Sequence, residues 1–282
     1  MSIAYLNGNY LPLPEAMVQA IDRGFIFGDG VYEVIPVFGG HRLRLHEHFL
    51  RLQASLDAIY MDNPHTETEW TGIVQGLLDH NPGAENRSVY LQVTRGAALR
   101  DHLIPDDIAP TVFGTCRAIP DRDLSAGVSA ITHEDIRWQY CHIKATSLLP
   151  SVLLRERARR KDGSVEAILL RDGFVTEGAA SNVFVVLNGR IRTPAKSNHL
   201  LPGITRDLVV ELLNTQGPGC EEAPISAAEL NSAGEIWITS STVGIAPVTR
   251  LDGRPVGQGV PGTHWQATDA LYQNFKRRPL AK

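Results

Sequence analysis

The chain has 282 residues, of which 43% are hydrophobic and 21% charged, a composition typical of a globular protein with one large or two ordinary domains. Its formal net charge of -4 and mixed signs exclude the basic stripe of a nucleic-acid-binding protein, so small-molecule chemistry is favoured. Cys116, Cys141 and Cys220 are far apart and odd in number, which argues against a disulfide framework and favours a cytoplasmic location.

The first part of the chain reads as a strand-rich unit. "NG" at residues 7–8 lies between two short apolar segments and predicts a hairpin. Phe49, Leu52 and Leu56 recur at helical spacing and predict a helix over 45–60. The other elements predicted here are strands at 31–38, 87–96 and 110–119 and a helix at 68–80. We expect this part, residues 1–118, to be the smaller of two domains, with an α/β organisation.

The segment "PDRDLSAG" interrupts this pattern, and residues 119–124 are predicted to link the domains. The larger second domain, 125–282, is expected to hold mainly antiparallel strands, which argues against a doubly wound nucleotide-binding sheet. Its predicted strands are 127–138, 165–173, 174–178, 181–189 and one ending at 240, and its predicted helices are 147–161, 203–216 and one within 224–233. The fold class is therefore α+β, or mixed α/β, with two domains.

Two short motifs do not indicate a site. "GDG" at 28–30 lacks the glycine spacing of a dinucleotide fingerprint, and no helix is expected after it. "HEH" at 46–48 has no third clustered ligand, so no metal is predicted. The chain also shows neither a leader-like apolar segment at its start nor a membrane-spanning one, so neither secretion nor membrane insertion is expected.

Lys144 is the first candidate for chemistry. It falls in "IRWQYCHIKATSLLP" at 136–150, an alternating run predicted to be a half-buried strand that carries Lys144 on the same side as Trp138, Tyr140 and His142. A surface lysine at a strand end is the ordinary interpretation. The aromatic and hydroxyl-bearing neighbours instead suit the rim of a pocket, and a lysine shielded from water can act as a nucleophile toward aldehydes. That is the requirement for a Schiff base with pyridoxal phosphate.

The other groups that pyridoxal phosphate needs have candidates as well. In "LPGITRD", Gly203 frees the backbone and Thr205 is expected to cap a helix whose first N–H groups can receive a phosphate. "ITSST" at 238–242 ends a strand in hydroxyl residues. Glu177, in a tight turn of small residues, could keep the pyridine nitrogen protonated, although an exposed turn glutamate is the simpler interpretation.

Taken together, these segments resemble the class IV aminotransferases, the fold-type IV group of pyridoxal 5'-phosphate enzymes, and among them the bacterial D-amino-acid transaminases. The resemblance runs in order through "DRGFIFGDGVYEV", "HEHFLRL", "QVTRG", "EDIRW", "IK", "EAILLRDGFVTEG", "SNVF", "GITRD" and "TSST", which covers nearly the whole chain.

The resemblance implies a set of site residues. Lys144 would form the Schiff base and Glu177 would face the pyridine nitrogen. The phosphate would be held by Arg51, Ile204, Thr205, Ser240 and Ser241, and the substrate carboxylate by Tyr32, Arg100 and His102. The loop that carries Arg100 would reach a neighbouring subunit, which implies a homodimer. Ala179 and Ala180 stand where the family has a serine-rich turn, so the resemblance implies no hydroxyl contacts there.

The expected reaction is a ping-pong transamination between a D-amino acid and a 2-oxo acid such as pyruvate or 2-oxoglutarate, with Lys144 as both nucleophile and base. Three activities of the same fold remain as alternatives: branched-chain L-amino-acid transamination, (R)-selective amine transamination and aminodeoxychorismate lyase chemistry. A binding protein that has lost catalysis is a further alternative. The pocket residues, Val34 and Pro36 among them, do not identify the preferred amino acid.

Overall fold

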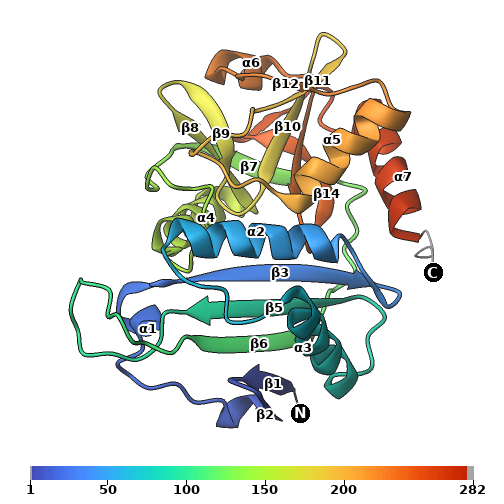
Figure 1. The fold of residues 1–282 in the computed structure, drawn as a ribbon. Coiled ribbons are helices and arrows are strands. Elements are labelled where there is room, and N and C mark those ends of the chain that lie inside the picture. The colour runs from blue at the N-terminus through green and yellow to red at the C-terminus, as the bar shows by residue number, and fades with distance from the viewer. Residues whose placement is uncertain (1, 278–282) are drawn as a thin grey trace. The chain divides into compact units, whose positions relative to one another are not determined.

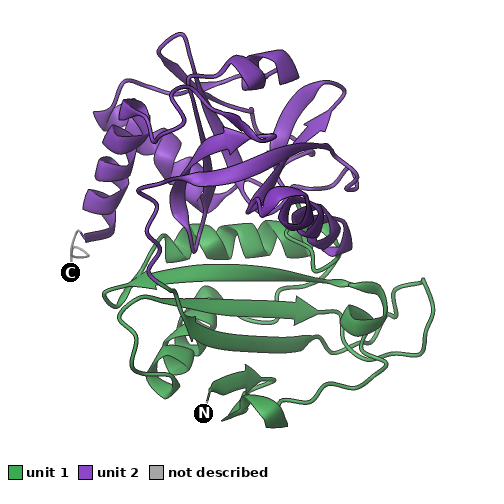
Figure 2. Cartoon of the chain, turned by 180° about the vertical axis from the view of Figure 1, so that it is seen from behind, with its two compact units in different colours: residues 1–120, 143–147, 280–282 green, residues 121–142, 148–279 purple. Residues whose placement is uncertain are grey.

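The structure is a computed structural model that describes residues 2–277. These residues form two compact units (Figure 2): unit 1 holds residues 2–120 and Ile143–Ser147, and unit 2 holds 121–142 and 148–277. The change of unit after Pro120 falls in the predicted linker. The chain then returns to unit 1 for Ile143–Ser147, so it passes between the units more than once and a single linker does not separate them.

Unit 1 opens with the predicted hairpin of β1 (Ile3–Leu6) and β2 (Asn9–Pro12). Its turn residues Asn7 and Gly8 have φ of 46° and 94°, the left-handed conformation that a two-residue hairpin turn requires. A short 3-10 helix, Leu13–Glu15, and the one-turn helix α1 (Arg23–Phe27) follow. The sequence patterns did not predict α1, because five residues are too few to show helical periodicity.

The central sheet of unit 1 is antiparallel, with strand order β2-β1-β6-β5-β3-β4 among the described residues. Its long strands are β3 (Gly30–Phe38), β5 (Arg87–Thr94) and β6 (Thr111–Ala118), and β4 (His41–Arg42) follows a turn at Gly39 and Gly40. Tyr32 lies opposite Gln92, and Val34 lies opposite Tyr90.

Helices α2 (Leu45–Ala58) and α3 (Glu67–His80) cover one face of this sheet (Figure 1). Both helices were predicted. Phe49, Leu52 and Leu56 are buried in a core that they share with alternate residues of β3, Val31 and Ile35 among them. Because side chains alternate along a strand, Tyr32 and Val34 point to the other face of the sheet.

Unit 2 is built on a larger sheet of mainly antiparallel strands, with parallel pairing only at β14·β7, β7·β8 and β11·β12 among the described residues. The strands are β7 (Val128–Glu134), β8 (Glu166–Arg171), β9 (Phe174–Gly178), β10 (Asn182–Leu187), β11 (Arg190–Thr193), β12 (Glu221–Glu222), β13 (Glu235–Ser240), β14 (Gly244–Leu251) and β15 (Arg254–Pro255).

Four helices of unit 2 are described by the structure. Helix α4 (Leu149–Asp162) packs on β8 and β7, and α6 (Ala227–Ser232) packs on β9 and β10. Helix α5 (Ile204–Gln216) packs on β13 and on α7 (Thr263–Arg277), which also contacts β14. Pro150 lies in the first turn of α4, where proline is tolerated.

The predicted strand over 136–150 is wrong. Within it the residues before α4 form turns and bends, and only Ala145 makes a β-bridge, to Val31. The alternation misleads because the backbone groups bond to scattered partners: the Cys141 N–H donates to the Asn198 carbonyl, and the Lys144 N–H donates to the Ser55 hydroxyl. Tyr140 is 56% exposed and does not share a buried side with Lys144.

Candidate active site

Lys144 is fixed in unit 1 by its backbone. Its N–H donates to the Ser55 Oγ at 3.2 Å, and its carbonyl accepts from the Tyr32 N–H at 3.0 Å. The side chain is half-buried, and Nζ lies 4.1 Å from the centroid of the Tyr32 ring. The structure therefore brings together two of the predicted residues, an amine and the phenol of a predicted carboxylate ligand.

Arg51, a predicted phosphate ligand, belongs to a buried ionic cluster. Its Nε and Nη2 donate to the two carboxylate oxygens of Glu33, both at 2.8 Å, and the His48 Nδ1 is 2.7 Å from the same carboxylate. Glu33 is fully buried. Burial opposes its ionisation, but the Arg51 guanidinium and His48 hold the pKa of the Glu33 carboxyl well below its usual range.

Glu33 was not among the predicted site residues, although the sequence carried a signal for it. It shares its side of β3 with Val31 and Ile35, so the strand pattern places an acidic residue in the core. A buried carboxylate needs a cationic partner, and a planar guanidinium provides a two-point match. Glu33 therefore fixes the orientation of Arg51.

The other predicted carboxylate ligands, Arg100 and His102, lie on an exposed loop of unit 1 between β5 and β6. Both contact the ring of Phe27 at the end of α1. The Arg100 guanidinium carbon is 5.3 Å from the ring centroid, and the His102 ring centroid is 5.6 Å away. A single aromatic ring thus contacts both the guanidinium and the imidazole.

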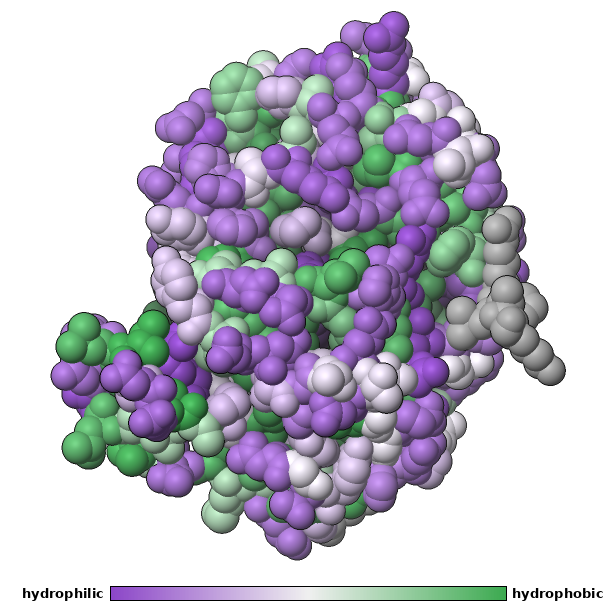
Figure 3. All heavy atoms as spheres, in the orientation of Figure 1, coloured by the Kyte–Doolittle hydropathy of each residue, from purple (hydrophilic) through white to green (hydrophobic). Residues whose placement is uncertain are grey.

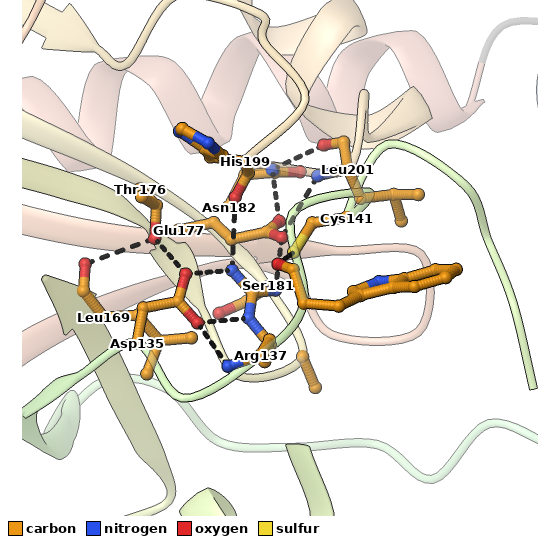
Figure 4. A network of polar contacts seen from close by, with 12 residues as sticks. Asp135, Arg137, Cys141, Leu169, Thr176, Glu177, Ser181, Asn182, His199 and Leu201 are labelled. Carbon is orange, nitrogen blue, oxygen red and sulfur yellow. Dashed lines mark hydrogen bonds and ion pairs between the residues drawn. The ribbon is translucent and has the colours of Figure 1, made fainter. Parts of the chain in front are cut away.

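Glu177 lies in unit 2 at the end of β9 and is buried (Figure 4). Its Oε1 accepts from Arg137 Nη1 at 2.5 Å and from the Leu201 N–H at 3.1 Å, and its Oε2 accepts from Asn182 Nδ2 at 3.1 Å. The expectation of an exposed turn glutamate is therefore excluded. Burial raises the pKa of the Glu177 carboxyl to about 7, although Arg137 opposes this rise.

Arg137 is shared between two carboxylates. Its Nε donates to Asp135 at 2.9 Å, and Asp135 also forms an ion pair with Arg171 at 3.1 Å and accepts from the Thr176 hydroxyl at 3.2 Å. Sequence reasoning missed Arg137 because its partner Glu177 lies 40 residues away in the chain. The guanidinium provides a counter-charge that supports a carboxylate at this buried position.

Asn182 connects Glu177 to the predicted phosphate-binding segment within unit 2. Its Nδ2 also donates to the Leu201 carbonyl at 2.8 Å, two residues before the N-cap of α5, Gly203. A Cβ at Gly203 would overlap the Asn182 Oδ1, so the loop needs glycine here. Asn182 also pairs with Thr239 across β10 and β13.

Thr205 does not cap α5, contrary to expectation. The N-cap is Gly203, and no side chain caps the helix. Ile204 and Thr205 are the first two helical residues, whose N–H groups have no acceptor within the helix. Ser240 and Ser241 are half-buried where β13 ends, beside the buried Thr239 hydroxyl, which has no hydrogen-bond partner.

Within each unit, the chemistry of these residues suits a part of pyridoxal phosphate. The uncapped first turn of α5 and the hydroxyl groups at the end of β13 are phosphate donors, and the unpartnered Thr239 hydroxyl is a further polar group there. Glu177 is a buried carboxylate of the kind that can pair with a protonated ring nitrogen. Lys144 provides an amine on an aromatic ring. Within residues 2–277, no cluster of three His, Cys, Asp or Glu side chains is arranged to bind a metal ion.

Comparison with known proteins places these observations in a family. The model of amino-transferase class IV matches residues 30–251. The chain is 39% identical to a D-alanine aminotransferase of Bacillus licheniformis over 98% of both chains. It is 36% identical to a D-alanine aminotransferase of Listeria monocytogenes over 96% of this chain and 93% of that protein.

Solved structures share the fold. A branched-chain amino acid aminotransferase from T.th., solved with pyridoxamine 5'-phosphate, superposes with a TM-score of 0.92, covering 98% of this chain and 95% of that one. At 24% identity this likeness shows the fold alone. The predicted fold class and the family resemblance are both confirmed.

Proposed function

The chain belongs to the amino-transferase class IV family, and from this premise we propose that it moves the amino group of a D-amino acid to a 2-oxo acid such as pyruvate or 2-oxoglutarate. It is a pyridoxal 5'-phosphate-dependent aminotransferase. The relatives named D-alanine aminotransferases, at up to 39% identity over nearly the full chain, support D-alanine as a donor. The observation that supports a substrate with a carboxylate is the contact of both Arg100 and His102 with the ring of Phe27.

Lys144 is the proposed catalytic residue. Pyridoxal phosphate, when bound, supplies an aldehyde that condenses with amines and a ring that withdraws electrons from the substrate α-carbon. Lys144 Nζ would hold the cofactor through its aldehyde carbon, and as a free amine it would act as the base that moves the proton of the substrate α-carbon. The contacts of its backbone with Ser55 and Tyr32 support this role, because they fix the point from which the side chain extends.

The remaining residues would bind and orient the cofactor. Glu177, backed by Arg137, would hold a proton on the ring nitrogen. The backbone N–H groups of Ile204 and Thr205, the hydroxyls of Ser240 and Ser241, and the Arg51 guanidinium would bind the phosphate.

The substrate carboxylate would be recognised by Arg100, His102 and Tyr32. A guanidinium matches the two oxygens of a carboxylate, and the imidazole and the phenol add donors beside it. These residues would contact the carboxylate group, which is present in amino acids and absent from simple amines. They are therefore proposed to select amino acids over amines.

A homodimer is proposed as the working assembly. Leu99 and Leu103, on the loop of Arg100, are 85% and 77% exposed, and Figure 3 shows hydrophobic side chains gathered where this loop projects from unit 1. Such side chains favour burial against a second copy. Light scattering of the purified protein tests this assembly.

A cytoplasmic location is also proposed. The three cysteines form no disulfide. No helix within residues 2–277 is long and apolar enough to cross a membrane. Fractionation of cells that produce the protein tests this location.

The absorption spectrum of the cofactor-loaded protein tests the function. Addition of D-alanine, with no acceptor, is expected to convert the pyridoxal form to the pyridoxamine form, whereas L-alanine is not. Conversion by the L isomer alone would assign the chain to branched-chain L-amino-acid transamination. No response to either isomer would favour amine or lyase chemistry, and a protein that takes up no cofactor would be a binding protein without catalysis.

A further inference from the structure

We propose that Arg23 and Phe27 of α1 are positioning residues that set the selectivity for the substrate carboxylate, by holding the loop that carries Arg100 and His102. The inference rests on the proposed role of that loop in carboxylate binding. It concerns residues for which the sequence indicated no function. All of the contacts that support it lie within unit 1.

The side chain of Arg23 binds backbone carbonyl groups of the loop on either side of His102. Its Nη1 donates to the Asp101 carbonyl at 2.6 Å and to the Leu103 carbonyl at 3.3 Å. Asp101 lies between Arg100 and His102 in the chain, so this one guanidinium fixes the peptide that joins them. Arg23 is itself only 4% exposed, and its Nε donates to Asp29 at 2.8 Å.

Phe27 provides the side-chain contacts. The guanidinium carbons of Arg23 and Arg100 lie 4.9 and 5.3 Å from its ring centroid, and the His102 ring lies 5.6 Å away. A cation is attracted to the face of an aromatic ring, which biases the side chain of Arg100 toward this orientation. The loop is otherwise exposed at Arg100 and His102, so few other contacts restrict these side chains.

The base of the loop is also attached to α1 and the residues before it. The Arg23 N–H donates to the Gly96 carbonyl at 2.8 Å, and the Ala98 N–H donates to the Ile21 carbonyl at 3.2 Å. Gly96 has a φ of 105° and is crowded by the Ala109 carbonyl, so the two ends of the loop approach closely. The anchoring of the loop is therefore continuous from its base to the Asp101 peptide.

Arg95 offers a matched control. It is 5% exposed, and its Nε donates to the same Asp29 carboxylate at 2.8 Å. Its other nitrogens donate to the Ile59 and Tyr60 carbonyls, outside the loop. Arg23→Lys and Arg95→Lys thus each replace a buried guanidinium that donates one hydrogen bond to the same Asp29 oxygen, and only the first releases the Asp101 carbonyl between Arg100 and His102.

The experiment measures kcat and KM of the cofactor-loaded protein for D-alanine and for D-alaninamide, which has the same carbon skeleton and a neutral amide. Arg23→Lys is expected to raise KM for D-alanine about 10-fold, with a much smaller change in kcat and little change for D-alaninamide, because the released loop holds Arg100 and His102 less firmly against the carboxylate. Phe27→Leu is expected to act in the same direction and serves if the lysine variant does not fold. Hydrogen exchange in residues 98–103 should accelerate in Arg23→Lys and not in Arg95→Lys.

Two results would overturn the inference by different routes. Equal effects of Arg23→Lys and Arg95→Lys on KM and on loop exchange would show that Arg23 acts only through general stability. An unchanged preference for D-alanine over D-alaninamide in Arg100→Ala would remove the proposed carboxylate role of the loop, and the inference with it. A KM effect in Arg100→Ala without one in Arg23→Lys or Phe27→Leu would overturn the inference and leave the proposed function intact.

Discussion

Replacing Glu177 by glutamine is expected to change how the stability of the cofactor-free protein depends on pH. The wild-type carboxyl has its pKa raised from the ordinary 4.5 to about 7, with burial as the main cause. As the pH rises from 4.5 to 7, the unfolded state releases this proton while the folded state keeps it. The folded protein therefore loses stability over that interval, and the loss is complete above pH 7.

The size of the loss follows from the two pKa values. The interval from 4.5 to about 7 corresponds to about 3 kcal/mol of unfolding free energy. Glu177→Gln removes the titrating proton and keeps an oxygen that can accept from Arg137 and the Leu201 N–H. The free energy of unfolding of the variant relative to the wild type should therefore rise by about this amount between pH 4.5 and pH 7.5.

Urea denaturation of both cofactor-free proteins at several pH values between 4.5 and 8 measures this difference. Glu156→Gln is a suitable control, because hydrogen bonds from Arg159 and Arg160 lower the pKa of that half-buried carboxyl to about 2, so its contribution to stability changes only below pH 4.5 and stays constant over the measured range. A difference between Glu177→Gln and wild type that stays constant with pH would refute the reasoning, since it would mean that Arg137 keeps Glu177 ionised throughout. Saturation with pyridoxal phosphate should flatten the wild-type dependence, because a protonated ring nitrogen favours the carboxylate.

Three further changes test the rest of the site. Lys144→Ala should retain cofactor binding and lower turnover of D-alanine with 2-oxoglutarate by several orders of magnitude, and near-normal turnover would disprove its role. Glu33→Gln should destabilise the protein by about 3 kcal/mol, because it breaks a buried ion pair, and should weaken cofactor binding measured by titration; unchanged affinity would argue against a phosphate role for its arginine partner. Gly203→Ala should weaken cofactor binding, since a Cβ overlaps Asn182, whereas Gly72→Ala in α3, which meets nothing within 4 Å, should leave binding unchanged and stabilise the protein by about 0.5–1 kcal/mol in urea denaturation.

The regular elements of the fold could be predicted where local spacing determines burial. In α2, Phe49, Leu52 and Leu56 are apolar at helical intervals and are buried, so the pattern in the sequence and the packing agree. The segment around Lys144 shows the limit of such patterns. Its aromatic and polar residues alternate as in a strand, but its backbone bonds to Ser55 and Asn198 at distant positions, which no local pattern encodes.

The residues of the candidate site also fall into two groups, those that the sequence indicates and those that only the fold reveals. Lys144 and Glu177 could be proposed because the family motifs mark them, and their roles remain predictions. The partners that fix such residues are found only through the fold: Arg137 reaches Glu177 across 40 positions, and Arg23 reaches the Asp101 carbonyl across 78. Glu33 is the exception, because a charged residue on the core-facing side of a strand already indicates a buried cationic partner.

The return of Ile143–Ser147 to unit 1 limits how this protein can be recombined with its relatives. A chimera joined once near residue 120 would take Lys144 from one parent and the Ser55 hydroxyl and Tyr32 N–H that hold its backbone from the other. The neighbouring Thr146, whose hydroxyl donates to the Gly28 carbonyl at 2.9 Å, would be separated from its partner in the same way. A chimera that exchanges residues 143–147 together with the first unit would keep these contacts within one parental sequence.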